Sequence, residues 1–176
     1  MMKEPNVVDL SSILLKDSIL KCVEPDIYSV LPDESWNEYD SKFGLFYDLV
    51  ACNPFYNRIV WGYSTQMFSK LVDDALHSAS DGPVLDIGCG SLAFTKNEYS
   101  QYKDRLVVLS DQSIAMLRMA KERLIKINGK IPDNLLLLHA DALNLPFQDN
   151  SFKTIISENL LHCPGQAHQN VLTRPS

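Results

Sequence analysis

An acid followed by two glycines at alternate positions stands near the middle of the chain, where residues 84–91 read VLDIGCGS. The apolar start of this segment predicts a buried strand, which would deliver Asp86 and a tight turn at Gly88 and Gly90 to the carboxyl edge of a parallel sheet. We expect a helix to begin at Leu92, so that its first amides and the bare glycine backbone form a seat for a nucleotide-like ligand. Such a pattern is common, so its meaning depends on the residues downstream.

A second acid, Asp111, follows the next apolar run, residues 105–110 (RLVVLS). An acid at the end of the second strand of a nucleotide-binding sheet can accept hydrogen bonds from both hydroxyls of a ribose. Asp111 or Ser113 can equally cap the helix that the apolar periodicity predicts over residues 114–127. Both roles are compatible with the sequence, and they can coexist on neighbouring residues.

Two ligands fit the glycine turn. Gly88, Gly90 and Ala93 satisfy the Gly-x-Gly-x-x-Ala pattern of dinucleotide-binding proteins. An acid beside a pyrophosphate is electrostatically unfavourable, however, and Asp86 stands two residues before the first glycine. The other ligand is S-adenosylmethionine, because an acid at this position would lie near its amino-acid end. Asp111 is compatible with either ligand, so it does not distinguish a dinucleotide from S-adenosylmethionine.

Residues 138–152 read LHADALNLPFQDNSF. They resemble the segment of class I S-adenosylmethionine-dependent methyltransferases in which an Asp-Ala pair meets the adenine. With the acid-glycine turn and Asp111, this segment completes three motifs in family order and at family-like spacing, over about residues 83–162. The resemblance is to small-molecule methyltransferases of the quinone-biosynthesis type. Three features are departures from the family pattern. Leu92 stands where many members have a third glycine, Lys153 replaces an acid, and residues 157–160 (SENL) are not the Asn-Pro-Pro-aromatic signature of amino-group methyltransferases.

The resemblance implies a site and a reaction. The cofactor S-adenosylmethionine would be held by Asp86, Gly88, Gly90, Asp111, Gln112, Asp141 and Ala142. The methyl group would pass to a small-molecule acceptor, and no metal ligand is expected. By analogy with the loop after the fourth strand, the candidates for catalysis are Glu158, Asn159 and His162, of which the histidine could act as a base near neutral pH. The alternatives are a non-catalytic adenosine-binding or interaction module and an NAD-binding oxidoreductase.

The alternation of strands and helices predicts an α/β, Rossmann-like fold over residues 81–162, a parallel sheet of order 3-2-1-4 with helices on both faces. A helical extension over residues 1–80 precedes it, and an irregular tail over residues 163–176 follows. Within the extension, apolar spacing predicts helices over residues 7–23 and 64–77. Only four of the seven strands of the family sheet have candidates, which indicates a truncated product. The fourth strand would then present an open edge through which the chain could self-associate.

Composition narrows the function classes further. The 176 residues carry a net charge of -6 and have a pI near 5.1, so no nucleic-acid or anionic lipid partner is expected. No apolar run approaches the roughly 20 residues that span a bilayer, and the N-terminus lacks the pattern of a secretion signal. The four cysteines are scattered along the chain, which favours reduced thiols in a cytoplasmic protein.

Overall fold

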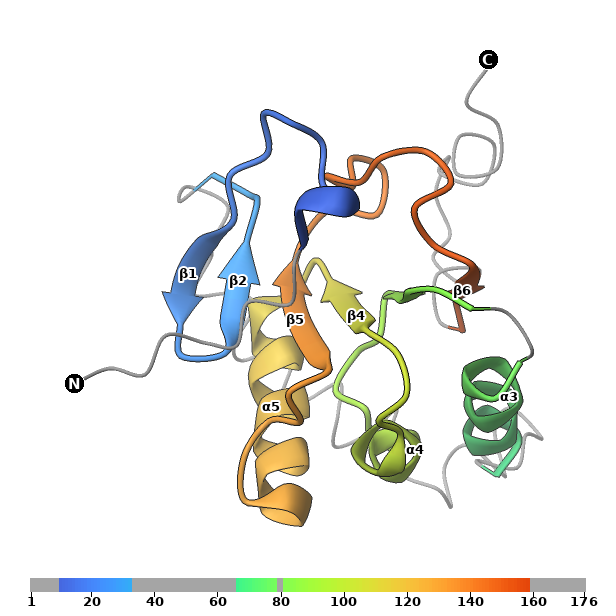
Figure 1. Ribbon diagram of the computed structural model, residues 1–176. Helices are drawn as coiled ribbons and strands as arrows, with labels where there is room; N and C mark the ends of the chain where they lie inside the picture. The colour runs from blue at the N-terminus through green and yellow to red at the C-terminus, as the bar shows by residue number, and fades with distance from the viewer. Residues whose placement is uncertain (1–9, 33–65, 79–80, 159–176) are drawn as a thin grey trace.

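The computed structural model describes residues 10–32, 66–78 and 81–158. These residues form one six-stranded sheet with three α-helices and a short 3-10 helix (Figure 1). The strands are β1 (Lys21–Glu24), β2 (Ile27–Ser29), β3 (Val84–Ile87), β4 (Val107–Asp111), β5 (Leu135–His139) and β6 (Thr154–Ile156). The helices are η1 (Leu10–Ser12), α3 (Gln66–Leu76), α4 (Lys96–Gln101) and α5 (Ile114–Asn128). In these three ranges no helix has the length and apolar character that crossing a membrane requires.

The centre of the sheet has the predicted topology. The strand order is β1-β2-β5-β4-β3-β6, and the pairs β5–β4, β4–β3 and β3–β6 are all parallel. The predicted order 3-2-1-4 corresponds to β5-β4-β3-β6 and is confirmed for these four strands, although the sheet as a whole is extended by β1 and β2. Because the central strands are parallel, their carboxyl ends lie at one edge. Asp86, Asp111 and Asp141 lie within or just after those ends.

The helix predicted over residues 7–23 is wrong for the part that the structure describes. Only η1 is helical there, and β1 and β2 follow as an antiparallel hairpin whose turn includes Asp26 in a left-handed conformation (φ 67°). β2 then pairs in parallel with β5, and Ile27 is fully buried. The hydrogen bonds and burial that favour a strand here come from a segment far away in the sequence, and local apolar spacing does not reveal them.

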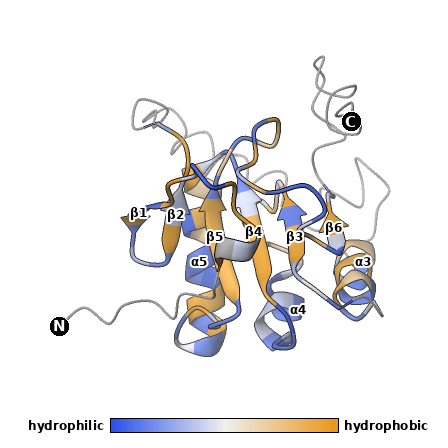
Figure 2. Ribbon diagram, turned by 45° about the horizontal axis from the view of Figure 1, so that its top comes forward, coloured by the Kyte–Doolittle hydropathy of each residue, from blue (hydrophilic) through white to orange (hydrophobic). Residues whose placement is uncertain are grey.

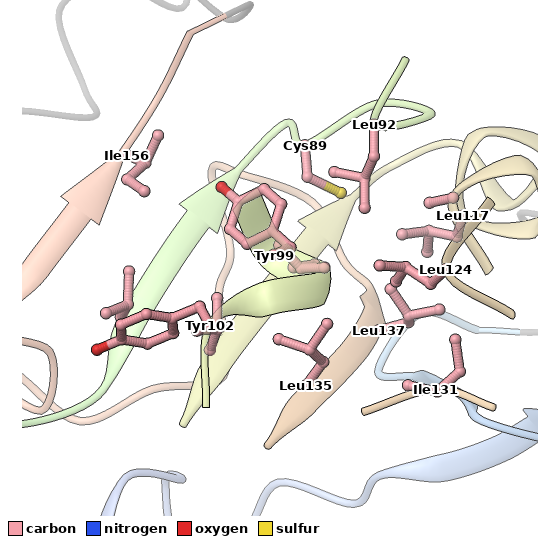
Figure 3. Close-up of a cluster of buried hydrophobic side chains, with 14 of the residues drawn as sticks. Cys89, Leu92, Tyr99, Tyr102, Leu117, Leu124, Ile131, Leu135, Leu137 and Ile156 are labelled. Carbon is pink, nitrogen blue, oxygen red and sulfur yellow. The ribbon is translucent and has the colours of Figure 1, made fainter. Parts of the chain in front are cut away.

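The three α-helices pack over one face of the sheet. Their apolar side chains join those of β3, β4 and β5 in a single buried cluster that includes Leu92, Tyr99 and Leu124 (Figure 3). α5 matches the helix predicted over residues 114–127, with Ser113 as its N-cap and Gly129 (φ 75°) as its C-cap. Figure 2 shows the apolar strands of the centre with the helices along one side.

α3 lies within the predicted range 64–77, but its apolar residues do not all face the core. Val72 and Leu76 are buried, whereas Met67 and Leu71 are about half exposed (55% and 50%). The helix therefore contacts the sheet through a narrower stripe than its apolar periodicity predicts.

The other face of the sheet is covered, among the described residues, by η1 and the loop of residues 140–152. Ile13 and Phe147 are buried there, and a backbone bridge joins Leu14 to Phe147. The amide of Gln148 also donates to the carbonyl of Ile13 at 2.9 Å. In the described ranges, the helices predicted for both faces are therefore present on one face only.

Candidate functional site

Asp86 is a buried acid near the end of β3. Its side chain is only 4% exposed, and the Tyr99 hydroxyl of α4 donates to its Oδ2 at 2.6 Å. Burial raises the pKa of Asp86 to about 7, the Tyr99 hydrogen bond opposes this rise, and the negative charge of Asp111 adds to it. Unlike an ordinary carboxyl group, Asp86 can hold a proton close to neutral pH.

The glycine turn that follows Asp86 has a backbone conformation that residues other than glycine rarely adopt. Gly88 and Gly90 have φ values of 73° and 59°, in the region that glycine occupies without strain. The amides of Gly88 and Cys89 donate to the carbonyl of Ser110 at 2.8 and 3.0 Å, which holds the turn against β4. A Cβ atom at Gly90 would meet no heavy atom within 4 Å. The space in front of Gly90 is therefore open.

The helix expected to begin at Leu92 begins later, at Lys96, and has six residues. Leu92 itself has φ 55°, a left-handed conformation that does not continue into a right-handed helix. Its side chain is 2% exposed and belongs to the helix-side core. The predicted helix start at Leu92 is therefore wrong, because turns separate the two glycines from α4.

Asp111 joins the glycine turn to the start of α5. Its Oδ2 accepts from the amide of Gly90 at 2.8 Å, and its Oδ1 accepts from the amide of Ser113 at 2.8 Å. The Ser113 hydroxyl in turn accepts from the amide of Met116 at 3.4 Å, so Ser113 is the N-cap of α5. Gln112, between them, has an exposed side chain. The acid is thus fixed at the site whether or not it also contacts a ligand.

Asp141 lies at the same edge, just beyond β5. The amide of Ala140 donates to the carbonyl of Asp111 at 3.1 Å, which places the start of this loop beside the end of β4. Asp141 is half-buried, and its Oδ1 accepts from the amide of Leu143 at 3.0 Å. Ala142 packs against the apolar cluster on the face opposite the α-helices. The structure therefore brings all of the predicted cofactor residues to one edge of the sheet.

Glu158 is the one predicted catalytic residue inside the described ranges, since Asn159 and His162 lie outside them. Its side chain is half-buried, and its Oε1 has no hydrogen-bond partner. Burial raises the pKa of Glu158 to about 8, and the negative charges of Asp86 and Glu98 add to the rise. Like Asp86, Glu158 can therefore hold or release a proton near neutral pH.

Two residues at this edge were missed by sequence reasoning. Tyr99 contacts Asp86 from α4, and the available signal was a tyrosine in the helix expected after Leu92. His139 is 1% exposed and contacts Ser29 and the carbonyl of Gln112. Its signal was a polar residue that ends an otherwise apolar strand, but its partner Ser29 lies in the segment predicted as a helical extension and not as part of the sheet.

Known proteins are similar to this chain in sequence. The methyltransferase domain model matches residues 84–174, which is more than half of the 176 residues. The chain belongs to the methyltransferase domain family. An uncharacterized chloroplastic methyltransferase of Arabidopsis thaliana is 29% identical over 96 residues, which cover 53% of this chain and 27% of that protein. The match thus spans about a quarter of the length of that methyltransferase.

Solved structures of methyltransferases are also similar to this family member. A putative S-adenosyl-L-methionine-dependent methyltransferase from Methanococcus maripaludis has 18% identity and a TM-score of 0.55, with 78% of this chain and 61% of that chain covered. At this identity the likeness shows a shared fold. A methyltransferase from Thiobacillus denitrificans, in complex with S-adenosyl-L-homocysteine, has 20% identity and a TM-score of 0.39, with 56% of this chain and 37% of that chain covered.

The methyltransferase resemblance and the Rossmann-like α/β class predicted from the sequence are both confirmed. These likenesses do not test the role of any single residue. The cofactor and catalytic assignments made for this methyltransferase-family chain therefore stay predictions.

Proposed function

We propose that this chain binds S-adenosylmethionine at the carboxyl edge of β3, β4 and β5 and transfers its methyl group to a small-molecule acceptor. The observation that carries the proposal is the hydrogen bond between the amide of Gly90 and the Asp111 carboxylate. It links the two motifs that would hold the amino-acid end and the ribose of the cofactor. Family membership supports the same reaction.

The residues present fit such a ligand. Gly90 faces open space, which an adenosyl group could approach as far as the backbone. The Asp111 carboxylate is held at this edge by the amides of Gly90 and Ser113, where a carboxylate oxygen could accept from ribose hydroxyls. Asp86 would lie toward the amino-acid end, and Asp141 with Ala142 would meet the adenine.

When bound, the cofactor supplies a methyl group already activated by its positively charged sulfur. The protein has to align the acceptor and exclude water. Where the acceptor must lose a proton, Glu158 is the described residue suited to take it. Its raised pKa of about 8 makes its carboxylate a stronger base than an ordinary one, and its Oε1 has no hydrogen-bond partner.

Calorimetric titration of the full chain tests the cofactor class. We expect S-adenosylhomocysteine to bind and NAD not to bind. Asp111→Ala should weaken binding by about tenfold or more, the effect of losing charge-assisted hydrogen bonds. Asp133→Ala is the matched control, because Asp133 is an exposed acid before the amino end of β5, at the opposite edge of the sheet. Equal affinity of the two variants for S-adenosylhomocysteine would contradict the placement of Asp111 in the cofactor site.

Methyl release from labelled S-adenosylmethionine, measured with a panel of small molecules, tests the reaction itself. Turnover with any acceptor supports an enzyme. Tight cofactor binding without turnover across the panel would favour the non-catalytic binding module, and NAD binding would favour the oxidoreductase. The experiment also compares Glu158→Gln, which should lower turnover more than cofactor affinity.

Self-association and location remain further proposals. In the described ranges, β6 pairs with β3 on one side and with no strand on the other, so a second copy could add to this edge. Light scattering at several concentrations should then show a dimer at the higher ones, and a constant monomer mass would exclude it. Location in the cytoplasm, without a nucleic-acid partner, rests on composition, and a tagged chain viewed in cells tests it.

A further inference from the structure

His139 occupies a central place at the carboxyl edge of the sheet. It is the last residue of β5, with Ser29 of β2 as its register partner on one side and Asp111 of β4 on the other. Its side chain is 1% exposed. A buried imidazole needs hydrogen-bond partners for both nitrogens, because an unpaired polar group in the interior is costly.

Both ring nitrogens lie within hydrogen-bond distance of a polar partner. Nε2 lies 3.0 Å from the carbonyl oxygen of Gln112, which can only accept, so Nε2 carries the hydrogen. In the neutral ring Nδ1 is then an acceptor for the Ser29 hydroxyl at 3.0 Å, and the Leu31 carbonyl is a more distant acceptor for the same hydroxyl at 3.4 Å. The Ser29 oxygen also accepts from the amide of Leu31 at 3.0 Å. These hydrogen bonds form one chain from the hairpin to the Gln112 carbonyl.

The Gln112 carbonyl has a direct effect on the site. It shares a rigid peptide plane with the amide of Ser113, so fixing the direction of one fixes the other. That amide donates to Oδ1 of Asp111 at 2.8 Å, and Oδ2 of the same carboxylate accepts from Gly90. The orientation of His139 is thus coupled, through one peptide plane, to the orientation of the Asp111 carboxylate.

The N-terminal hairpin of β1 and β2 is held against α5 by polar contacts. The Arg118 guanidinium of α5 contacts Glu24 of β1, with Nε at 2.7 Å from Oε1. Lys121 of α5 also donates to the carbonyl of Pro25, in the hairpin turn. The hairpin therefore contacts α5 along its side and, through Ser29 and His139, the turn from which α5 begins.

We propose that His139 is a positioning residue that, with Ser29, aims the Asp111 carboxylate at the ribose of the bound nucleoside. The N-terminal hairpin is then part of the cofactor site. This inference rests on the proposed function, because it takes Asp111 as the ribose-binding acid. His139 acts through the Gln112–Ser113 peptide and touches no reacting atom.

The test compares Ser29→Ala, His139→Leu and His139→Gln in the full chain. Glutamine can place an amide donor close to the position of Nε2, so it should largely restore what leucine removes. Ser100→Ala is the matched control, because Ser100 is also buried but its hydroxyl has no hydrogen-bond partner. Calorimetry measures the affinity for S-adenosylhomocysteine and for its 2′-deoxyribose analogue, and thermal unfolding is recorded for each variant.

We expect His139→Leu to lower the affinity for S-adenosylhomocysteine about tenfold and Ser29→Ala to lower it about threefold, because each variant loses a buried hydrogen bond. The affinity for the 2′-deoxy analogue should fall less. The preference for ribose over deoxyribose should therefore fall in both variants and return in His139→Gln. A purely structural role would weaken both ligands equally, and an unchanged preference would overturn the proposal. If His139→Leu does not fold, Ser29→Ala and His139→Gln decide the outcome.

Nuclear magnetic resonance of the ligand-free chain gives an answer that does not depend on cofactor binding. The ring ¹⁵N shifts should report a neutral imidazole protonated at Nε2. Exchange of the Ser113 amide with solvent should become faster in Ser29→Ala but not in Ser100→Ala. A ring protonated at Nδ1 alone, or an unchanged Ser113 exchange rate, would overturn the positioning role. A wild-type chain that passes this test but binds no S-adenosylhomocysteine would instead refute the proposed function.

Discussion

Replacing Asp86 by asparagine should make the stability of this protein respond differently to pH. Asparagine has nearly the same shape and can still accept the hydrogen bond that the Tyr99 hydroxyl donates to Oδ2 at 2.6 Å. It cannot ionise. The substitution therefore removes the cost of a buried negative charge while keeping the contact with α4.

The sign and size of the effect follow from the pKa of Asp86, which burial raises from 3.8 in the unfolded chain to about 7 in the fold. Between these two values the folded protein binds more protons than the unfolded one, so the free energy of unfolding falls as the pH rises. A shift of about three pH units corresponds to about 4 kcal/mol. Relative to the wild type, Asp86→Asn should gain stability across this window and keep that gain above pH 7.

Urea unfolding followed by circular dichroism, at pH values from 4 to 8, measures this difference. Tyr99→Phe provides a second arm, because the tyrosine hydrogen bond lowers the pKa of Asp86. Its removal should move the upper end of the window to higher pH. A stability difference between Asp86→Asn and wild type that is constant from pH 4 to 8, or that shrinks as pH rises, would refute the reasoning.

Three further substitutions test how the site is built. Gly90→Ala should lower stability by about 1 kcal/mol in thermal unfolding, because a residue with a side chain is strained at φ 59°. The same substitution should weaken the binding of S-adenosylhomocysteine, measured by calorimetry, far more than this strain implies. Leu92→Gly relieves the strain of a left-handed backbone but removes a buried side chain. The net result in urea unfolding should be a loss of about 2 kcal/mol of stability, and a gain in stability would contradict the packing described. Arg118→Ala should lower stability by up to about 1 kcal/mol through its partly exposed pair with Glu24, and added salt should reduce the difference.

The central part of the fold was predictable because its signals are local. Residues 84–87 and 107–111 are short apolar runs followed by turn residues, and α5 has both a regular apolar stripe and recognisable caps in Ser113 and Gly129. Most of the predicted cofactor residues belong to these elements or to the turns that follow them. Their common location at one edge then follows from parallel pairing alone.

The parts that failed depend on contacts between distant segments. The hairpin forms because β2 finds the edge of β5, and Ser29 and His139 are 110 residues apart. The late start of α4 depends on the left-handed backbone conformation of Leu92, which the burial of its side chain stabilises. The contact of Tyr99 with Asp86 depends on how α4 packs over β3. The spacing of apolar residues along the sequence does not reveal any of these arrangements.

The most direct test of the account is to titrate S-adenosylhomocysteine into ¹⁵N-labelled protein and follow every assigned backbone amide. The account predicts saturable shifts concentrated at residues 86–91, 111–113 and 140–142, at one edge of the sheet. Shifts centred instead on residues 130–134, at the opposite end of β5, would contradict it, as would a spectrum that does not change at millimolar ligand.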